Sequence, residues 1–225
     1  INLPVPGLGH LGKNLAGSFW PPKLVPVDSD TLETLPVRQF RSGLAECVKH
    51  ALIGHPDLMR LLEVHADALR DGRTGTLDDV LVQSIEAKRL VVEQDEHEYG
   101  RRMLLNLGHT FAHAIEPIKE LDLTHGEAVS VGLCAAMACA QLRGLLSAAE
   151  LNRVTDLLTG LRLPTQISVP QRIDDLLAAM RYDKKASGGQ LRLVLPTSSG
   201  AEVHDDVPIA DVTAAWRTVM PPSSE

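Results

Sequence analysis

Hydrophobic residues recur at intervals of three and four along most of the chain from Val37 onward, which is the period of an amphipathic α-helix. The pattern is clearest over residues 104–116, which we predict to be one helix that ends at Pro117, because proline cannot continue a helix. Its apolar positions would share one face toward a core: Leu104, Leu107, Phe111 and Ile115.

The same period predicts helices over most of the remaining chain. Phe40, Leu44, Cys47, Val48 and Ala51 form the apolar stripe of an early helix. Further helices are expected over residues 56–69, 77–95, 147–159, 170–181 and 206–219. Residues 128–142 (AVSVGLCAAMACAQL) are apolar on nearly every side, which is typical of a helix in the middle of a bundle.

Strand-like segments flank this helical region. Residues 23–28 (KLVPVD) predict a strand followed by a short capped helix over 29–34, and residues 1–14 predict a loop. Because a single strand cannot bury itself, the first segment should pair with a sheet that lies outside the sequence. Residues 190–196 (QLRLVLP) predict a second strand, with residues 201–204 as its hairpin partner. The fold class is therefore mainly α, with a small C-terminal β-hairpin.

Composition excludes several classes of function. The 225 residues carry a net charge of −7 with a pI near 5.7, which argues against a nucleic-acid-binding surface. The longest apolar stretch is about 15 residues, too short to span a bilayer. Cys47, Cys134 and Cys139 are odd in number and indicate buried thiols in a reducing compartment. The chain begins at Ile1 without a methionine, which suggests a fragment or a processed product.

Candidate chemistry is concentrated in residues 101–127. On the predicted helix, Asn106, His109 and His113 fall opposite the apolar face, joined by Arg102 if the helix begins that early. Two histidines one turn apart can bind a divalent cation, or can pair a ligand with a catalytic base. A third, His125, follows in a His-Gly-Glu turn. The alternative interpretation is a solvated polar face that happens to contain histidines.

Charged residues on two other predicted helices extend this site. Glu46 and Lys49 are three residues apart, so they form either a surface ion pair or a metal ligand beside a substrate-binding ammonium. Lys88 falls within the predicted apolar face of the helix over 77–95, made of Leu77, Leu81, Ser84, Val91 and Val92. It therefore either extends to the rim of that face or reaches into an anion site.

A three-ligand metal site could combine these residues. Glu46, His109 and His125 would leave one coordination position open, as in catalytic zinc sites, and His113 would move protons. The surrounding donors suit a phosphate or carboxylate substrate: Lys49, Lys88, Arg102, Asn106, Lys184 and Lys185. From the residues alone, this predicts a metal-assisted reaction on a small anionic molecule.

Several motifs resemble 3-dehydroquinate synthase, a sugar phosphate cyclase family. They run in order along nearly the whole chain: GKN, DSDTLETLPVRQFRSGLAECVKHALI, EAKRLVVEQDE, LLNLGHTFAHAIE, LTHGEAVSVG and MRYDKKASGGQLRLVLP. The resemblance implies a cytoplasmic lyase of the shikimate pathway that uses NAD and zinc (or cobalt). It would convert 3-deoxy-D-arabino-heptulosonate 7-phosphate into 3-dehydroquinate and phosphate, for aromatic amino acid biosynthesis.

The resemblance also implies residue roles. Glu46, His109 and His125 would bind the metal, and His113, Lys49, Lys88, Arg102 and Asn106 would be catalytic. Lys88 and Arg102 would contact the substrate carboxylate, and Asn106 with Lys184, favoured over Lys185, the phosphate. The cofactor or its cleft would be contacted by Lys13, Asn14, Thr31, Leu32, Glu33 and Thr34.

The family's architecture implies a domain division. Residues 1–36 would be a loop and the last strand of an otherwise absent NAD-binding α/β domain. Residues 37–220 would form the metal- and substrate-binding helical domain, and residues 221–225 would be a disordered tail. The full-length protein would be a homodimer, whereas this chain alone would bind NAD poorly and be inactive. Rival functions are another sugar phosphate cyclase, a metal-dependent hydrolase, and a non-catalytic helical domain.

Overall fold

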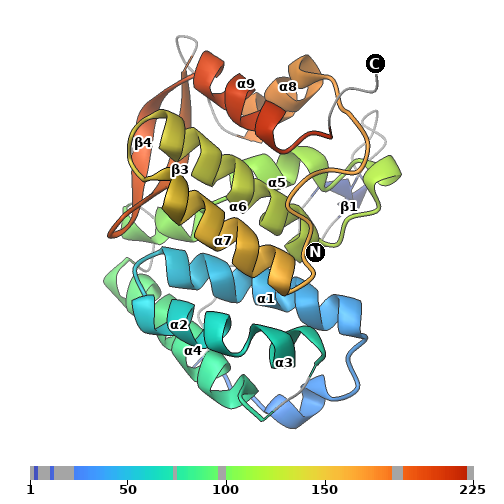
Figure 1. The fold of residues 1–225 in the computed structure, drawn as a ribbon, viewed down its shortest axis with the longest axis vertical. Helices are drawn as coiled ribbons and strands as arrows, with labels where there is room; N and C mark the ends of the chain where they lie inside the picture. Colours follow the sequence, from blue (N-terminus) through green and yellow to red (C-terminus); the bar gives the residue numbers. More distant parts are fainter. Residues whose placement is uncertain are drawn as a thin grey trace.

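The protein is mainly α-helical and ends in a β-hairpin followed by a helix, as the sequence predicts (Figure 1). The structure, a computed structural model, describes residues 3–4, 11–12, 23–72, 75–95, 100–183 and 190–221. The α-helices are α1 (Val37–Leu52), α2 (Pro56–Val64), α3 (Ala66–Arg70), α4 (Leu77–Gln94), α5 (His109–Ile115), α6 (His125–Leu142), α7 (Ala148–Gly160), α8 (Ile173–Asp183) and α9 (Ile209–Thr218). Three 3-10 helices are η1 (Ser29–Leu32), η2 (Arg101–Asn106) and η3 (Lys119–Leu121), and the strands are β1 (Leu3–Pro4), β2 (Leu11–Gly12), β3 (Gln190–Thr197) and β4 (Gly200–Pro208).

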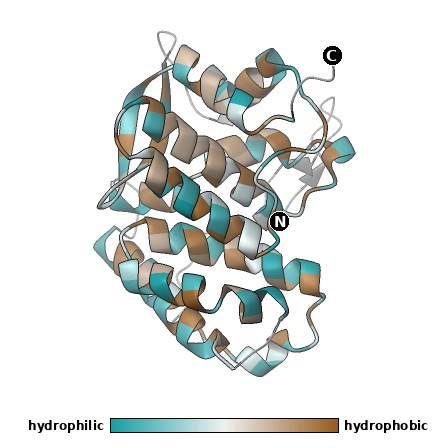
Figure 2. Cartoon of the chain, viewed as in Figure 1, coloured by the Kyte–Doolittle hydropathy of each residue, from teal (hydrophilic) through white to brown (hydrophobic). Residues whose placement is uncertain are grey.

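Helix α6 forms the centre of the molecule. It contacts α1, α5, α7, α9 and β3, and fourteen of its residues are buried. Figure 2 shows it as a largely hydrophobic helix between the flanking elements. The prediction of a central, all-round apolar helix is confirmed. Its surroundings explain the composition, because small alanines and glycines allow helices to pack closely on every side.

Helix α1 lies between two groups of helices. Helices α2, α3 and α4 lie on one side of it, and α5 to α9 lie on the other (Figure 1). Every residue of the predicted apolar stripe is buried: Phe40, Leu44, Cys47, Val48 and Ala51. Because α1 contacts α2 and α4 as well as α6, it connects both groups through one core.

The C-terminal elements close the other end of that core. Strands β3 and β4 pair antiparallel from Gln190↔Pro208 to Thr197↔Gly200, with an irregularity between Leu191 and Leu193. This confirms the predicted hairpin, with a longer second strand than expected. Trp216 of α9 is fully buried, and its ring centroid lies 5.2 Å from that of Phe111 of α5. Helix α9 therefore packs against both α5 and α6, and β3 packs against α6.

Two predicted elements near the beginning of the chain differ from the structure. Residues 23–28 are not a strand; Leu24, Val25 and Val27 are exposed, since no strand of the described chain pairs with this segment. The predicted loop over residues 1–14 contains the two-residue ladder of β1 and β2. The short helix after residue 28 is present as η1, capped by the Asp28 carboxylate, which accepts the Asp30 N–H.

Three helix predictions also need correction. The helix expected over 104–116 begins only at His109, because Gly108 has φ +75° and separates η2 from α5. The helix expected over 56–69 is divided at His65 into α2 and α3. On α4 the buried face consists of Leu77, Val80, Ser84, Ala87 and Val91, so Lys88 is exposed, and its predicted place within the apolar face is wrong.

The described helices include none that is both long and apolar enough to cross a membrane.

Candidate metal and substrate site

Three side chains from three helices meet at one point. Glu46 comes from α1, His109 from the first residue of α5 and His125 from the first residue of α6. The Glu46 Oε1 atom lies 3.4 Å from His109 Nε2 and 3.3 Å from His125 Nε2. Within the described residues these three offer ligand atoms that all lie within 4.8 Å of one another. A carboxylate and two imidazoles that follow it by 63 and 79 positions in the sequence therefore form one cluster.

Glycines make this convergence sterically possible. A Cβ atom at Gly126 would lie 1.9 Å from the Ser42 carbonyl oxygen, so α6 can approach α1 this closely only with glycine next to His125. A Cβ atom at Gly132 would lie 2.3 Å from the Gly108 carbonyl oxygen, immediately before His109. Close helix crossings thus lie beside two of the three clustered side chains.

The remaining ring nitrogens of both histidines have hydrogen-bond partners. His109 Nδ1 lies 3.2 Å from the Leu107 carbonyl oxygen, and His125 Nδ1 lies 3.2 Å from Glu116 Oε1. With the proton on Nδ1 donated to these acceptors, each Nε2 presents its lone pair toward the shared point. Partners of this kind orient the histidine ligands of metal sites.

The donor set and its spacing fit zinc. Ligand atoms arranged tetrahedrally around an ion with bonds of about 2.0–2.1 Å lie about 3.3–3.4 Å apart, which matches both distances from Glu46 Oε1. Two imidazoles and one carboxylate also form the three-ligand set of catalytic zinc sites, which leave one position open. The three clustered side chains are therefore suited to a zinc ion.

Charge at this cluster is arranged around Glu46. Burial alone would raise the pKa of Glu46, but hydrogen bonds with His109 and His125 and the charge of Lys49 lower it below its ordinary value. Its second oxygen, Oε2, forms an ion pair with Lys49 Nζ. Hydrogen bonds to Glu116 and then to Glu46 raise the pKa of His125 to about 9. Without a metal ion, the cluster is thus held together by the hydrogen bonds of both histidines with Glu46 and by the ion pair of Glu46 with Lys49.

Lys49 is not part of a surface ion pair. It is only 5% exposed, so its ammonium is directed inward beside the cluster, and the interpretation as an ordinary surface pair is wrong. His113 lies on the same side, with its ring centroid 5.6 Å from that of His109 and 6.5 Å from that of His125. An ammonium and a third imidazole therefore adjoin the space that the three ligands face.

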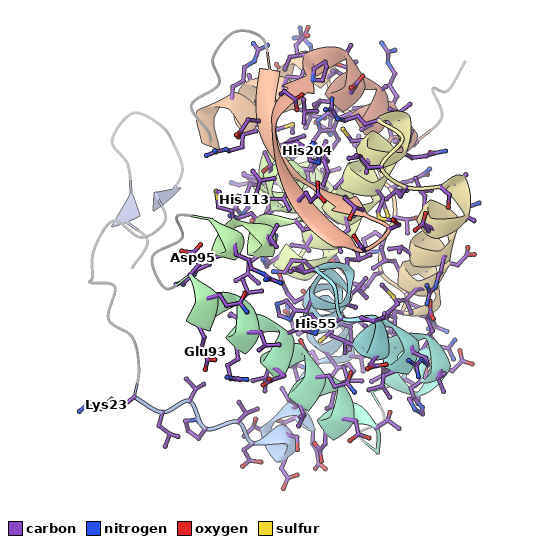
Figure 3. All side chains as sticks on the ribbon, turned by 90° about the vertical axis from the view of Figure 1, so that its left-hand side faces the viewer. Lys23, His55, Glu93, Asp95, His113 and His204 are labelled. Carbon is purple, nitrogen blue, oxygen red and sulfur yellow. The ribbon has the colours of Figure 1, made fainter. Side chains whose placement is uncertain are left out.

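The predicted substrate residues of η2 lie near this cluster in sequence but on a separate element. Arg102 and Asn106 are half-buried, and the Asp95 carboxylate accepts the backbone N–H groups of Gly100 and Arg102 at 2.7 and 2.9 Å. Figure 3 shows Asp95 and His113 on the same side of the molecule, where α4 packs against η2. Asp95 thus orders the start of η2.

Other predicted site residues are more distant or lie outside the described residues. Thr31, Leu32, Glu33 and Thr34 lie in and after η1, which Figures 1 and 3 show at the edge of the molecule, beyond α2–α4 from α5 and α6. Lys88 is exposed on α4, and its charge acts on His50 of α1. Lys13, Asn14, Lys184 and Lys185 fall outside the described residues.

Sequence analysis missed Glu116, the partner of His125. A signal was available, because Glu116 follows His113 by three positions and His109 by seven, which places all three on one helical face. It also missed Arg38 and Ser42, which precede Glu46 by eight and four positions on α1. Those two residues contact the first turn of α6.

Comparisons with known proteins agree on one family. The family described as 3-dehydroquinate synthase C-terminal matches residues 43–186. The chain is 42% identical over 211 residues to 3-dehydroquinate synthase of Dichelobacter nodosus, covering 92% of this chain and 57% of that protein. It is 45% identical over 206 residues to the Idiomarina loihiensis enzyme of the same name, covering 90% and 57%. The chain thus spans somewhat more than half the length of these relatives.

A solved structure shares the fold. It is ValA, a 2-epi-5-epi-valiolone synthase from Streptomyces hygroscopicus subsp. jinggangensis, with NAD+ and Zn2+ bound. The two structures superpose with a TM-score of 0.81 at 33% sequence identity, and the match covers 92% of this chain and 58% of ValA. Because the matched family region contains the three-helix cluster and covers more than half of the chain, the chain belongs to the 3-dehydroquinate synthase family.

Proposed function

We propose that this chain is the metal- and substrate-binding part of a 3-dehydroquinate synthase. The reaction would convert 3-deoxy-D-arabino-heptulosonate 7-phosphate into 3-dehydroquinate and phosphate with NAD and zinc. The observation that supports this most is the meeting of Glu46, His109 and His125 beside the buried Lys49, inside the region that matches the family. A zinc ion bound there would polarise the hydroxyl and ketone oxygens of the substrate.

The chain's own residues would bind and orient the substrate around that ion. Lys49 and Arg102 supply positive charge in an otherwise acidic chain, and Asn106 supplies an amide donor, so a substrate with both carboxylate and phosphate groups suits them. We assign the carboxylate to Arg102 and Lys88, and the phosphate to Asn106 and Lys184. His113, one turn from His109, would move protons to and from the substrate.

NAD binding would require more than the described helices. The relatives are longer than this chain, and we propose that residues 1–36 belong to a separate NAD-binding α/β domain of the whole protein, with Lys13, Asn14 and the η1 segment near its cleft. Residues 37–220 would be the helical domain. The whole protein would act in the cytoplasm as a homodimer, and this chain by itself would be inactive.

Substrate binding to the zinc-loaded chain tests the proposal. Calorimetric titration should show binding of 3-deoxy-D-arabino-heptulosonate 7-phosphate and at least about tenfold weaker binding of glucose 6-phosphate, which lacks the carboxylate. Lys49→Met should weaken binding of the former by at least about tenfold, because a buried charged hydrogen bond is lost. The control variant Lys119→Met, at an exposed position of the 3-10 helix η3, should bind it as the wild type does.

Two outcomes would contradict the proposal. Equal binding of both sugar phosphates would indicate a cyclase for another substrate, because the carboxylate would then contribute nothing to binding. Release of inorganic phosphate from the substrate by the zinc-loaded chain without any nicotinamide would indicate a metal-dependent hydrolase.

A further inference from the structure

Three residues on one face of α1 contact the beginning of α6 in succession. Arg38, Ser42 and Glu46 are spaced by four, so they lie one above another on the helix. We infer that Arg38, acting with Ser42, is a positioning residue that fixes His125 relative to Glu46 and thereby sets the metal affinity of the site. The inference rests on the proposed metal site.

The Arg38 guanidinium binds one residue that precedes His125 in the sequence and one that follows it. Its Nε and Nη2 atoms each donate to the Glu127 carboxylate at 2.8 Å, two residues after His125. Its Nη1 atom donates to Asp122 Oδ2 at 3.1 Å, and Nη2 also donates to the Asp122 carbonyl oxygen, three residues before His125. One planar group therefore holds the chain before the helix and the first turn of the helix together.

Ser42 and the helix cap complete the connection. The Ser42 Oγ atom accepts the Gly126 N–H at 3.0 Å and the Thr124 hydroxyl at 3.0 Å, so both neighbours of His125 are bound to it. Glu127 also accepts the Thr124 N–H at 2.8 Å, while the Thr124 hydroxyl accepts the Glu127 N–H at 3.3 Å. This reciprocal pair is a capping box.

These contacts fix the backbone on both sides of His125. Its side chain is 45% exposed, and its ring is restrained by the hydrogen bonds with Glu116 and Glu46. Zinc–ligand distances tolerate deviations of only about 0.2 Å. Loosening the first turn of α6 would therefore move Nε2 away from the position that Glu46 and His109 require, while leaving all three ligands present.

Arg38→Lys is the decisive variant. Lysine keeps the positive charge, so any loss of affinity reports the lost two-pronged geometry and not a change in the electrostatic potential. Arg153→Lys is the matched control. Arg153 of α7 also binds a glutamate of another helix, Glu63 of α2, and the side chains are similarly exposed at 57% and 29%, against 51% and 15% for Arg38 and Glu127.

The measurement is zinc affinity of the full 225-residue chain by competition with a chelator. We expect Arg38→Lys and Ser42→Ala each to bind zinc about tenfold more weakly than the wild type, and Arg153→Lys to bind it equally. The visible ligand-field spectrum of bound Co2+ should change in Arg38→Lys and not in Arg153→Lys. Circular dichroism of the metal-free proteins should show the same helix content in all four.

Each remaining outcome contradicts the inference. Equal zinc affinity of Arg38→Lys and Arg153→Lys, with zinc binding by the wild type intact, would overturn the positioning role and leave the proposed metal site standing. A tenfold loss in Arg153→Lys as well would assign the effect to general destabilisation. A wild type that binds no zinc would overturn both the proposed site and the inference.

Discussion

His50 should make the stability of the protein fall in mild acid. It lies on α1 one turn after Glu46, is only 8% exposed, and its Nδ1 atom lies 2.7 Å from the Ser84 hydroxyl of α4. Burial, together with the charges of Lys49 and Lys88, lowers the pKa of His50 from 6.5 to about 4. Neutral His50 is therefore part of the contact between α1 and α4.

The sign and size of the effect follow from proton linkage. Between pH 6.5 and about 4 the unfolded chain binds a proton at this position and the folded chain does not. The contribution to the free energy of unfolding is thus complete above pH 6.5 and is lost progressively as the pH falls from 6.5 to the folded pKa of about 4. The loss amounts to about 2 kcal/mol at pH 5 and about 3 kcal/mol below pH 4.

His50→Gln removes this titration. Urea unfolding of the metal-free wild type and variant, in chelator at pH 7.5 and pH 5, gives the difference between them at each pH. Other titrating groups are common to both proteins and cancel. We expect that difference to change by about 2 kcal/mol in favour of the variant on going to pH 5. The same difference at both pH values would refute the reasoning.

Two further predictions concern the cluster itself. Gly126→Ala should destabilise the protein by about 3 kcal/mol, because the new Cβ would collide with the Ser42 backbone; thermal unfolding should show no such loss for Gly43→Ala, where the added methyl would meet nothing within 4 Å. In the metal-free protein, Glu116→Gln should lower the pKa of His125 from about 9, measured by NMR titration of the imidazole. In the wild type, the pair of His125 with Glu116 stabilises the fold fully below pH 6.5, and this stability is lost as the pH rises through 9. The variant should not show that loss. An unchanged imidazole titration in Glu116→Gln would contradict the assigned hydrogen bond.

Much of the fold could be predicted because its helices carry strong periodic signals. The stripe of α1 and the all-round apolar sequence of α6 each permit only one kind of packing, and both are found as expected. On α4 the signal is ambiguous, since Val82 and Ile85 are exposed while Val80 and Ala87 are buried. The predicted face shares Leu77, Ser84 and Val91 with the buried one. It included Leu81 and Val92 in place of Val80 and Ala87, and this shift placed Lys88 within it.

The break before α5 was not visible in the pattern. Residues 104–116 keep a helical period across Gly108, and a single glycine in such a pattern does not reveal a left-handed conformation. The break depends on tertiary structure, because Gly108 lies against the Gly132–Leu133 backbone of α6. Arg102 and Asn106 consequently belong to a separate 3-10 helix and not to the face that carries His109 and His113.

The candidate site, like the fold, could be predicted only in part from the sequence. Helical spacing suggested His109 and His113 together, and the structure brings Glu46, His109 and His125 to one point. Their role in binding metal stays a prediction. Glu116 shares a helical face with His109 and His113, but this spacing does not identify its partner. Arg38 and Ser42 gave no comparable signal, because a polar residue that supports a site resembles any solvated side chain until its partner is known.

The most direct test of the central claim is zinc content after dialysis, measured by elemental analysis on the wild type, His109→Ala and the control His55→Ala. His55 precedes α2 and is not one of the three clustered residues. The account predicts about one zinc per chain for the wild type and the control, and loss of that zinc in His109→Ala, because one of three protein ligands is gone. Unchanged zinc content in His109→Ala, or none in the wild type, would contradict it.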